Sequence, residues 1–316
     1  MNRIVAFGTL AICVVGVLGA AGQQPTFRGT GDSVRVFVTV TDRDGRLVTT
    51  LSQNDFEVRD EGQPQPITLF DNTPQPIRLI VMIDVSGSME GNLPLLRAAA
   101  EQLFARLRPD DVARVGTFGR EVVISPRFTH DVETLRRELP DTVDPNAPTP
   151  LWRAVDQAMD AFGDEASEAR RVVLVLSDGK DSGPISFRER YVSQVEVIDR
   201  ARVDDVMVYG IGMRSRGSRP IQPGIGPGGL QAALMADLPD PGLALVAEQT
   251  GGGYAEIRFG QQDLGAALAH VADELHSQYL LGFAPPKRDG KVHDIDVRVA
   301  TRGLKPRARK SYVAPK

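Results

Sequence analysis

Three oxygen-bearing side chains stand at alternate positions at the end of an apolar run. The segment "VMIDVSGSME" contains Asp84, Ser86 and Ser88, in that order. A carboxylate close to a buried core is costly unless it is paired with a cation or bound to a metal. The pattern therefore predicts a positively charged partner at this point, and carboxylate and hydroxyl oxygens are the ligands that hard divalent cations prefer.

Two further polar residues occur later in comparable settings. Thr149 lies in "DPNAPTPLW", just before an expected helix, and Asp178 follows the apolar run "VVLVLS". Ligands of an open parallel sheet gather outside the carboxyl ends of its strands. We therefore expect these two residues to converge with the first three. The set has no imidazole and no thiolate, which favours Mg²⁺, with Mn²⁺ or Ca²⁺ as alternatives, over zinc or copper.

Strand and helix patterns alternate around these residues. The runs "IRLIVMIDVS" and "RRVVLVLSDG" are apolar throughout, as expected for strands covered on both faces, and "LWRAVDQAMDAF" has helical spacing. Alternation of this kind indicates parallel pairing with right-handed crossovers. We predict an α/β fold with a doubly wound, mostly parallel sheet over residues 77–278. Its Gly/Pro-rich segment, residues 214–242, is expected to be a surface insertion or a binding loop.

Both ends of this region carry short β-rich flanks, residues 26–76 and 279–316. The stretches "SVRVFVTV" and "KVHDIDVRVA" show strand patterns, and turn residues separate them from their neighbours. Each flank is too small to bury a core alone. We therefore predict that the two flanks pair into one smaller β-sandwich-like domain.

The first 22 residues have the pattern of a secretory signal peptide. One arginine precedes an apolar stretch that ends in small residues, in "MNRIVAFGTLAICVVGVLGAAGQQP". Export to the periplasm, the cell surface or the medium is therefore expected. An uncleaved membrane anchor is the alternative, because the stretch is close to the roughly 18 apolar residues that can cross a bilayer. Cys13, the only cysteine, lies within this segment, so a cleaved chain would form no disulfide.

The composition bounds the classes of protein that fit. The chain has 316 residues, of which 41% are hydrophobic and 25% are charged, which is ordinary for a globular protein. A formal net charge of -4 argues against a general nucleic-acid binder, although "RGLKPRARK" near the C-terminus is a local basic run.

The motif residues resemble the metal-ion-dependent adhesion site of von Willebrand factor A domains. "DVSGSM", the later threonine and "SDGKDSG" match that site in order, and the succession of strands and helices from about 76 to 278 is similar. The flanks and "QYLLGF" resemble a group of exported bacterial proteins built around this domain. The resemblance implies that Ser86, Ser88 and Thr149 ligate the ion, and that Asp84 and Asp178 bind it directly or through water.

The site loops contain one departure from the family pattern and one further aspartate. Many members of the family place Gly next to the metal-binding threonine, whereas Thr149 lies between Pro148 and Pro150. Proline fixes its own φ and restricts the residue before it, so we expect a stiffer loop here. Asp181, three residues after Asp178, has no assigned role and is expected to be solvated.

The resemblance implies a non-enzymatic exported module whose metal captures an Asp or Glu side chain of a protein partner. We expect neither nucleic acid nor a small-molecule substrate as a partner, and membrane contact only if the N-terminal segment stays uncleaved. A metal-dependent hydrolase is one alternative, but the Gly-x-Ser-x-Gly elbow is missing and no histidine lies in the predicted site loops. A constitutive scaffold subunit of a larger complex is the other alternative.

Overall fold

The computed structural model describes residues 33–163, 169–178, 180–183, 190–213, 240–257 and 264–316. These residues belong to one compact unit, residues 31–316. The predicted signal peptide with Cys13 lies outside the described residues, and so do residues 214–239 of the predicted insertion.

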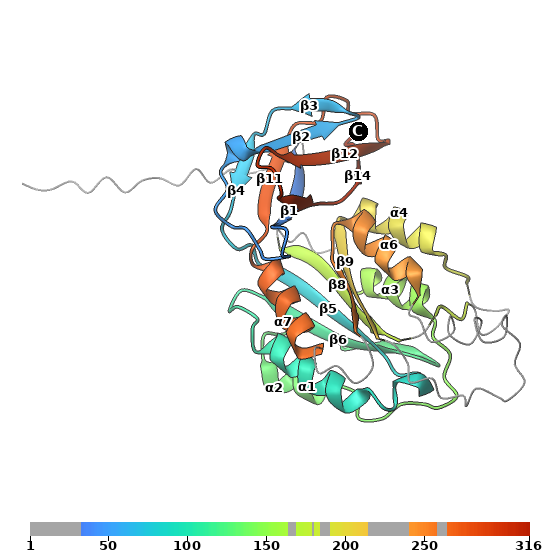
Figure 1. Ribbon diagram of the computed structural model, residues 1–316. Helices are drawn as coiled ribbons and strands as arrows, with labels where there is room; N and C mark the ends of the chain where they lie inside the picture. Colours follow the sequence, from blue (N-terminus) through green and yellow to red (C-terminus); the bar gives the residue numbers. More distant parts are fainter. Residues whose placement is uncertain (1–32, 164–168, 179, 184–189, 214–239, 258–263) are drawn as a thin grey trace, which may run out of the picture. The chain divides into compact units, whose positions relative to one another are not determined.

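A six-stranded sheet forms the centre of the α/β part (Figure 1). Its strand order is β10-β9-β8-β5-β6-β7, and every neighbouring pair is parallel except β6 and β7. The strands are β5 (Ile77–Asp84), β6 (Val112–Phe118), β7 (Val122–Ile124), β8 (Arg170–Ser177), β9 (Val206–Met213) and β10 (Tyr254–Ile257). Strand β5 is buried along its whole length, as its unbroken apolar run predicts.

Helices cover both faces of this sheet, because successive strand residues point to opposite sides. Leu79, Val81 and Ile83 of β5 pack in one apolar cluster with α1 and α7, whereas Ile80 and Met82 pack in another with α3, α4 and α6. The helices are α1 (Leu93–Phe104), α2 (Val132–Arg137), α3 (Leu151–Asp160), α4 (Gln194–Asp204), α6 (Pro241–Thr250) and α7 (Leu264–Leu275). The predicted doubly wound α/β fold is confirmed.

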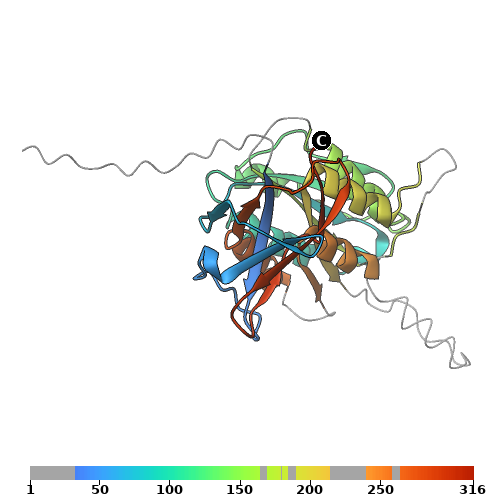
Figure 2. The same ribbon diagram turned by 90° about the horizontal axis from the view of Figure 1, so that it is seen from above.

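The two flanks interleave in a pair of four-stranded sheets (Figures 1 and 2). One sheet has the order β13-β1-β11-β4 and the other β14-β12-β2-β3, so N-terminal strands in blue lie beside C-terminal strands in red. The strands are β1 (Val34–Thr41), β2 (Phe56–Asp60), β3 (Gln63–Gln65), β4 (Leu69–Asp71), β11 (Tyr279–Phe283), β12 (Val292–Val299), β13 (Lys305–Arg307) and β14 (Ser311–Val313). The predicted pairing of the flanks is confirmed as part of the fold class, while the domain boundaries remain a prediction.

A buried polar network joins the flank strands to the α/β part. Glu274 of α7 is 4% exposed and accepts hydrogen bonds from Thr39 of β1 (3.1 Å), Tyr209 of β9 and Arg307 of β13. Gln278, just before β11, donates to Thr39 (2.7 Å) and to Tyr209 (3.2 Å). Because a buried charge without partners is strongly unfavourable, this network fixes the end of α7 between the two sets of strands.

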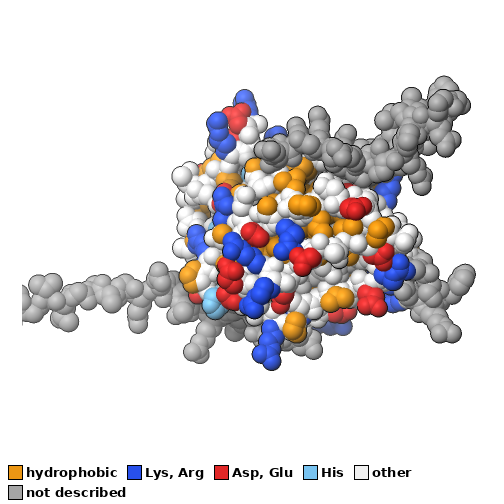
Figure 3. All heavy atoms as spheres, turned by 90° about the horizontal axis from the view of Figure 1, so that it is seen from below, with side chains coloured by type: hydrophobic (Ala, Val, Ile, Leu, Met, Phe, Trp, Pro, Cys, Tyr) orange, Lys and Arg blue, Asp and Glu red, His pale blue; other side chains and the backbone are white. Residues whose placement is uncertain are grey.

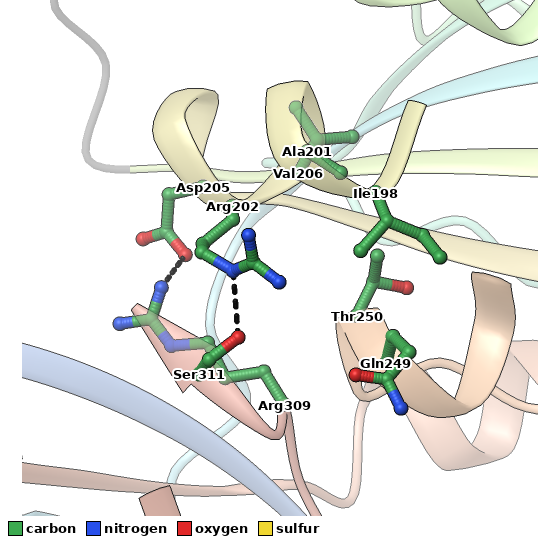
Figure 4. Close-up of a pocket in the computed structure, with 9 residues that line it drawn as sticks. All are labelled: Ile198, Ala201, Arg202, Asp205, Val206, Gln249, Thr250, Arg309 and Ser311. Carbon is green, nitrogen blue, oxygen red and sulfur yellow. Dashed lines mark hydrogen bonds and ion pairs between the residues drawn. The ribbon is translucent and has the colours of Figure 1, made fainter. Parts of the chain in front are cut away.

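A second link joins the C-terminal flank to the helices. Figure 4 shows a small pocket lined by α4, the end of α6 and the segment around β14. The Nε of Arg202 donates to the hydroxyl of Ser311 (2.6 Å), and Arg309 pairs with Asp205 (2.6 Å). These polar groups are engaged with one another, so the pocket is a packing contact between flank and helices.

Helix α2 and strands β3 and β13, all of them short, were not predicted. Helix α2 has only six residues, too few to show a helical period, and it depends on the N-cap Asp131, whose side chain accepts a hydrogen bond from Thr134 N (3.1 Å).

On the face of the molecule in Figure 3, hydrophobic, acidic and basic side chains lie interspersed. No helix among the described residues combines the length and apolar character needed to cross a membrane.

Candidate metal centre

Asp84 lies at the carboxyl end of β5, between β6 and β8. Its side chain is completely buried, with Oδ1 accepting a hydrogen bond from Ser86 N (2.9 Å) and Oδ2 from the hydroxyl of Ser177 (2.6 Å). Burial raises the pKa of Asp84, and the hydrogen bonds from Ser177 and Ser86 only partly offset this. A carboxylate held here therefore needs a positive charge nearby in order to stay ionised.

The two serines connect this carboxylate to a second one. The short 3₁₀ helix Gly87–Met89 begins after Ser86, yet the Ser86 side chain makes no capping hydrogen bond. Its Oγ instead lies 3.1 Å from the Oγ of Ser88, which donates to Oδ1 of Asp178 (2.7 Å). Helix capping, the ordinary use of serine at such a place, does not account for this arrangement.

Asp178 follows β8 and is 1% exposed. Its Oδ1 accepts from Ser88, whereas its Oδ2 is buried and has no hydrogen-bond partner among the described residues. Burial raises the pKa of Asp178 to about 7, and the negative charge of Asp84 adds to that effect. When both are ionised, the two buried aspartates therefore repel each other. The carboxylate oxygen without a hydrogen-bond partner at this point is Asp178 Oδ2.

Thr149 lies on a neighbouring loop and is also buried. Asp144, at the start of this loop, donates its N–H to the carbonyl of Val85 (3.0 Å). A Cβ atom at Gly87 would lie 2.5 Å from the Pro145 carbonyl oxygen, so the two loops touch closely. Within the described residues, no hydrogen bond joins the Thr149 hydroxyl to the other four candidates. Ligation by Thr149 accordingly stays a prediction.

Asp181 differs from the solvated residue expected from the sequence. Its side chain is partly buried, with Oδ1 accepting from Trp152 N (3.3 Å) and Oδ2 from Gly183 N (3.0 Å). Its own N–H donates to Oδ2 of Asp240, the N-cap of α6 (3.0 Å). Burial raises the pKa of Asp181. Sequence reasoning missed this role because "SDGKDSG" does not distinguish its two aspartates.

The donor set fits a hard divalent cation. When both are ionised, the two buried carboxylates carry excess negative charge that a cation would balance. The hydroxyls of Ser86 and Ser88 lie beside each other at the same edge, and Asp178 Oδ2 has no hydrogen-bond partner among the described residues. Such oxygens match the preference of Mg²⁺, Mn²⁺ and Ca²⁺. In the part of the chain that the structure describes, no group of three or more His, Cys, Asp or Glu residues is placed to hold a metal. A metal at this edge would therefore depend on serine hydroxyls as well as on aspartates.

Comparison with known proteins found one family model that matches the central region. Residues 79–180 match the family model described as the von Willebrand factor type A domain. This segment includes Asp84, Ser86, Ser88, Thr149 and Asp178. No curated protein matches the chain.

Several solved structures are similar at low identity. A conserved hypothetical protein, BatB from Bacteroides thetaiotaomicron, is 17% identical over 63% of this chain and 97% of its own, with a TM-score of 0.47. A von Willebrand factor type A protein from Catenulispora acidiphila is 11% identical over 84% and 76%, with a TM-score of 0.47. The pilus adhesin SpaC from Lactobacillus rhamnosus GG is 9% identical over 85% and 49%, with a TM-score of 0.43. At this level the likenesses carry no functional inference.

Proposed function

The chain carries a von Willebrand factor type A domain, and we propose that this domain holds a divalent cation with which it captures an acidic side chain of a protein partner. One observation carries the proposal: Asp84 and Asp178 are both buried at one edge of the sheet and are connected through two serines. Ser86 donates its N–H to Asp84, its hydroxyl lies beside that of Ser88, and Ser88 donates to Asp178. A purely structural site would rarely keep two buried like charges without a cation between them.

The candidate residues would contribute two kinds of oxygen to the binding of the ion. Ser86, Ser88 and Thr149 would offer neutral oxygens, and Asp84 and Asp178 would supply negative charge directly or through water. When bound, Mg²⁺, or Mn²⁺ or Ca²⁺ in its place, supplies positive charge and a coordination position that an outside carboxylate can fill. Two carboxylates at most balance the charge of the ion, and neutral hydroxyls leave it attractive to an Asp or Glu of the partner.

The protein is proposed to be non-enzymatic. Ser86 and Ser88 hydrogen-bond to each other, and Ser88 donates to Asp178, in a chain that organises oxygens around one point. A serine hydrolase would need a base in contact with its nucleophile, and no described histidine contacts either hydroxyl. The proposal includes export, for which the support is the signal-peptide pattern of residues 1–22.

Capture of a carboxylate can be tested with Mn²⁺ as the probe ion. Water-proton relaxation of the Mn²⁺-loaded protein is measured while a blocked tripeptide with a central glutamate is added. The expected result is a saturable fall in the water-proton relaxation rate, because the glutamate displaces water from the ion. The same peptide with a central glutamine is the control. An equal effect of both peptides, or none with either, would overturn the proposed capture of acidic side chains.

A further inference from the structure

Helix α3 begins without a capping side chain of its own. Its N-cap position is Pro150, which has no side-chain oxygen, and no local side-chain hydrogen bond caps the helix. The first N–H groups of a helix need acceptors from elsewhere, especially when they are buried. Leu151 N donates to the carbonyl of Thr149 (2.9 Å), whereas the acceptor of Trp152 N lies outside the helix.

Asp181 supplies that acceptor from 29 positions further along the chain. Its Oδ1 accepts from Trp152 N (3.3 Å), and its Oδ2 accepts from Gly183 N (3.0 Å), so one carboxylate holds both the start of α3 and its own loop. The next residue, Ser182, donates its N–H to the carbonyl of Thr149 (2.9 Å). The loop that follows β8 is thereby fixed directly against the threonine.

Two aspartates of one loop thus have different tasks. Both oxygens of Asp181 are occupied by main-chain N–H groups, whereas Asp178 leaves Oδ2 without a partner in the described structure. An oxygen already engaged by an N–H is poorly placed to ligate an ion as well. The free oxygen of Asp178 points to ligation and the engaged pair of Asp181 to support of the ligands.

We propose that Asp181 is a positioning residue, which sets the distance between the loop of Thr149 and the loop of Asp178 at the metal centre. This inference rests on the proposed function, because it assigns the two loops to one metal site. A third element joins the arrangement, since the N–H of Asp181 donates to Oδ2 of Asp240 at the start of α6 (3.0 Å). Loss of the carboxylate would free the start of α3 and widen the site.

The test compares Mn²⁺ affinity, measured by calorimetry, in the full-length wild type, Asp181→Ala and Asp181→Asn. Loss of a residue that supports metal ligands typically lowers affinity by roughly 10- to 100-fold, and we expect Asp181→Ala to do so. Asp181→Asn keeps one acceptor oxygen and should fall between the wild type and the alanine variant. Hydrogen exchange at the Trp152 amide should accelerate in Asp181→Ala with or without Mn²⁺, which tests the link independently of the ion.

The matched control is Asp131→Ala. Asp131 caps α2 through Thr134 N (3.1 Å), so its loss also removes one helix cap, but at a helix that contributes no candidate ligand. Its Mn²⁺ affinity should equal that of the wild type. Mn²⁺ binding by the wild type with unchanged affinity in Asp181→Ala would overturn this inference alone. No Mn²⁺ binding by the wild type would overturn the proposed metal site and this inference with it.

Discussion

Ser88 donates a 2.7 Å hydrogen bond to Oδ1 of Asp178, a residue 90 positions later in the chain. The bond joins the loop after β5 to the loop after β8, two strands that are parallel neighbours in the sheet. Their carboxyl ends therefore meet at one edge, and each strand delivers a polar residue to the same point. This relationship is the basis of the candidate metal centre.

Replacement of Asp178 by Asn should abolish metal binding and raise the stability of the metal-free protein. The change removes one of two buried negative charges that repel each other, so at pH 8 with a chelator we expect the variant to be more stable than the wild type by about 1 kcal/mol. Mg²⁺ at about 100 times its dissociation constant should stabilise the wild type by about 2.7 kcal/mol and the variant not at all. Urea unfolding with and without Mg²⁺ measures both effects. A variant that is less stable with chelator and still responds to Mg²⁺ would show that Asp178 has only a structural role.

Gly87 allows the two site loops to approach each other. An alanine there would bring its Cβ to 2.5 Å from the Pro145 carbonyl oxygen, so one loop must move. We expect Gly87→Ala to lose roughly 10-fold or more in Mn²⁺ affinity, because ligand loops displaced by a few tenths of an ångström no longer fit the ion. Gly91→Ala is the control, since nothing lies within 4 Å of a Cβ atom there. Equal affinities for the two variants would disprove the close fit of the loops.

The interactions of Asp111 indicate how the stability of the protein depends on pH in the acid range. It is buried and accepts hydrogen bonds from Ile77 N (3.1 Å), Arg108 N (2.7 Å) and His276 (2.7 Å). Burial by itself would raise the pKa of Asp111, but the hydrogen bonds from His276 and from the two N–H groups outweigh it, and the pKa is lowered. A lowered pKa contributes stability above the unfolded value of about 4 and loses it as the pH falls through the folded value.

The variant Asp111→Asn should accordingly lose about 1 to 3 kcal/mol at pH 7, and its stability should fall less steeply than that of the wild type below about pH 4. Urea unfolding between pH 2 and pH 7 measures both quantities. Asp110→Asn, at the exposed neighbouring position, is the control and should follow the wild type. Parallel acid profiles of Asp111→Asn and the wild type would show that the Asp111 interactions do not contribute.

Truncation tests the interleaved flanks. A chain that ends at Ser277 lacks β11 and β13, the two strands that pair with β1, and it also lacks β12, which pairs with β2. Without these partners the N-terminal strands cannot bury their apolar faces. We expect amide hydrogens of residues 34–41 to lose protection from exchange in the truncated chain. Protection equal to that of the full-length protein would mean that the N-terminal flank folds independently.

The sequence predicts the elements of the sheet better than the roles within its loops. The apolar runs of β5 and β8 revealed buried parallel strands, and the polar residues after them located the candidate site at their carboxyl ends. The different roles of Asp178 and Asp181 depend on which N–H groups each carboxylate meets, and those groups lie far away in the chain. No local pattern encodes such contacts.

The same limit applies to the polar network around Glu274. Its partners Thr39, Tyr209 and Arg307 come from three strands that are distant in sequence, and each of them alone resembles an ordinary polar residue. Only the assembled fold shows that they share one buried carboxylate. Thr149 is the opposite case, since the sequence singled it out while no hydrogen bond joins its hydroxyl to another candidate ligand among the described residues.

The most direct measurement of the central claim is calorimetric titration of the purified protein with Mn²⁺ and Mg²⁺. The variant Ser86→Ala/Ser88→Ala removes both hydroxyls between the aspartates, and Ser193→Ala, which removes the N-cap serine of α4, is its control. Circular dichroism verifies that all three proteins are folded. We predict one binding site in the wild type and in Ser193→Ala, and no binding in the double variant. Wild-type binding that survives intact in the double variant, or no binding in the wild type, would contradict a metal centre at this edge of the sheet.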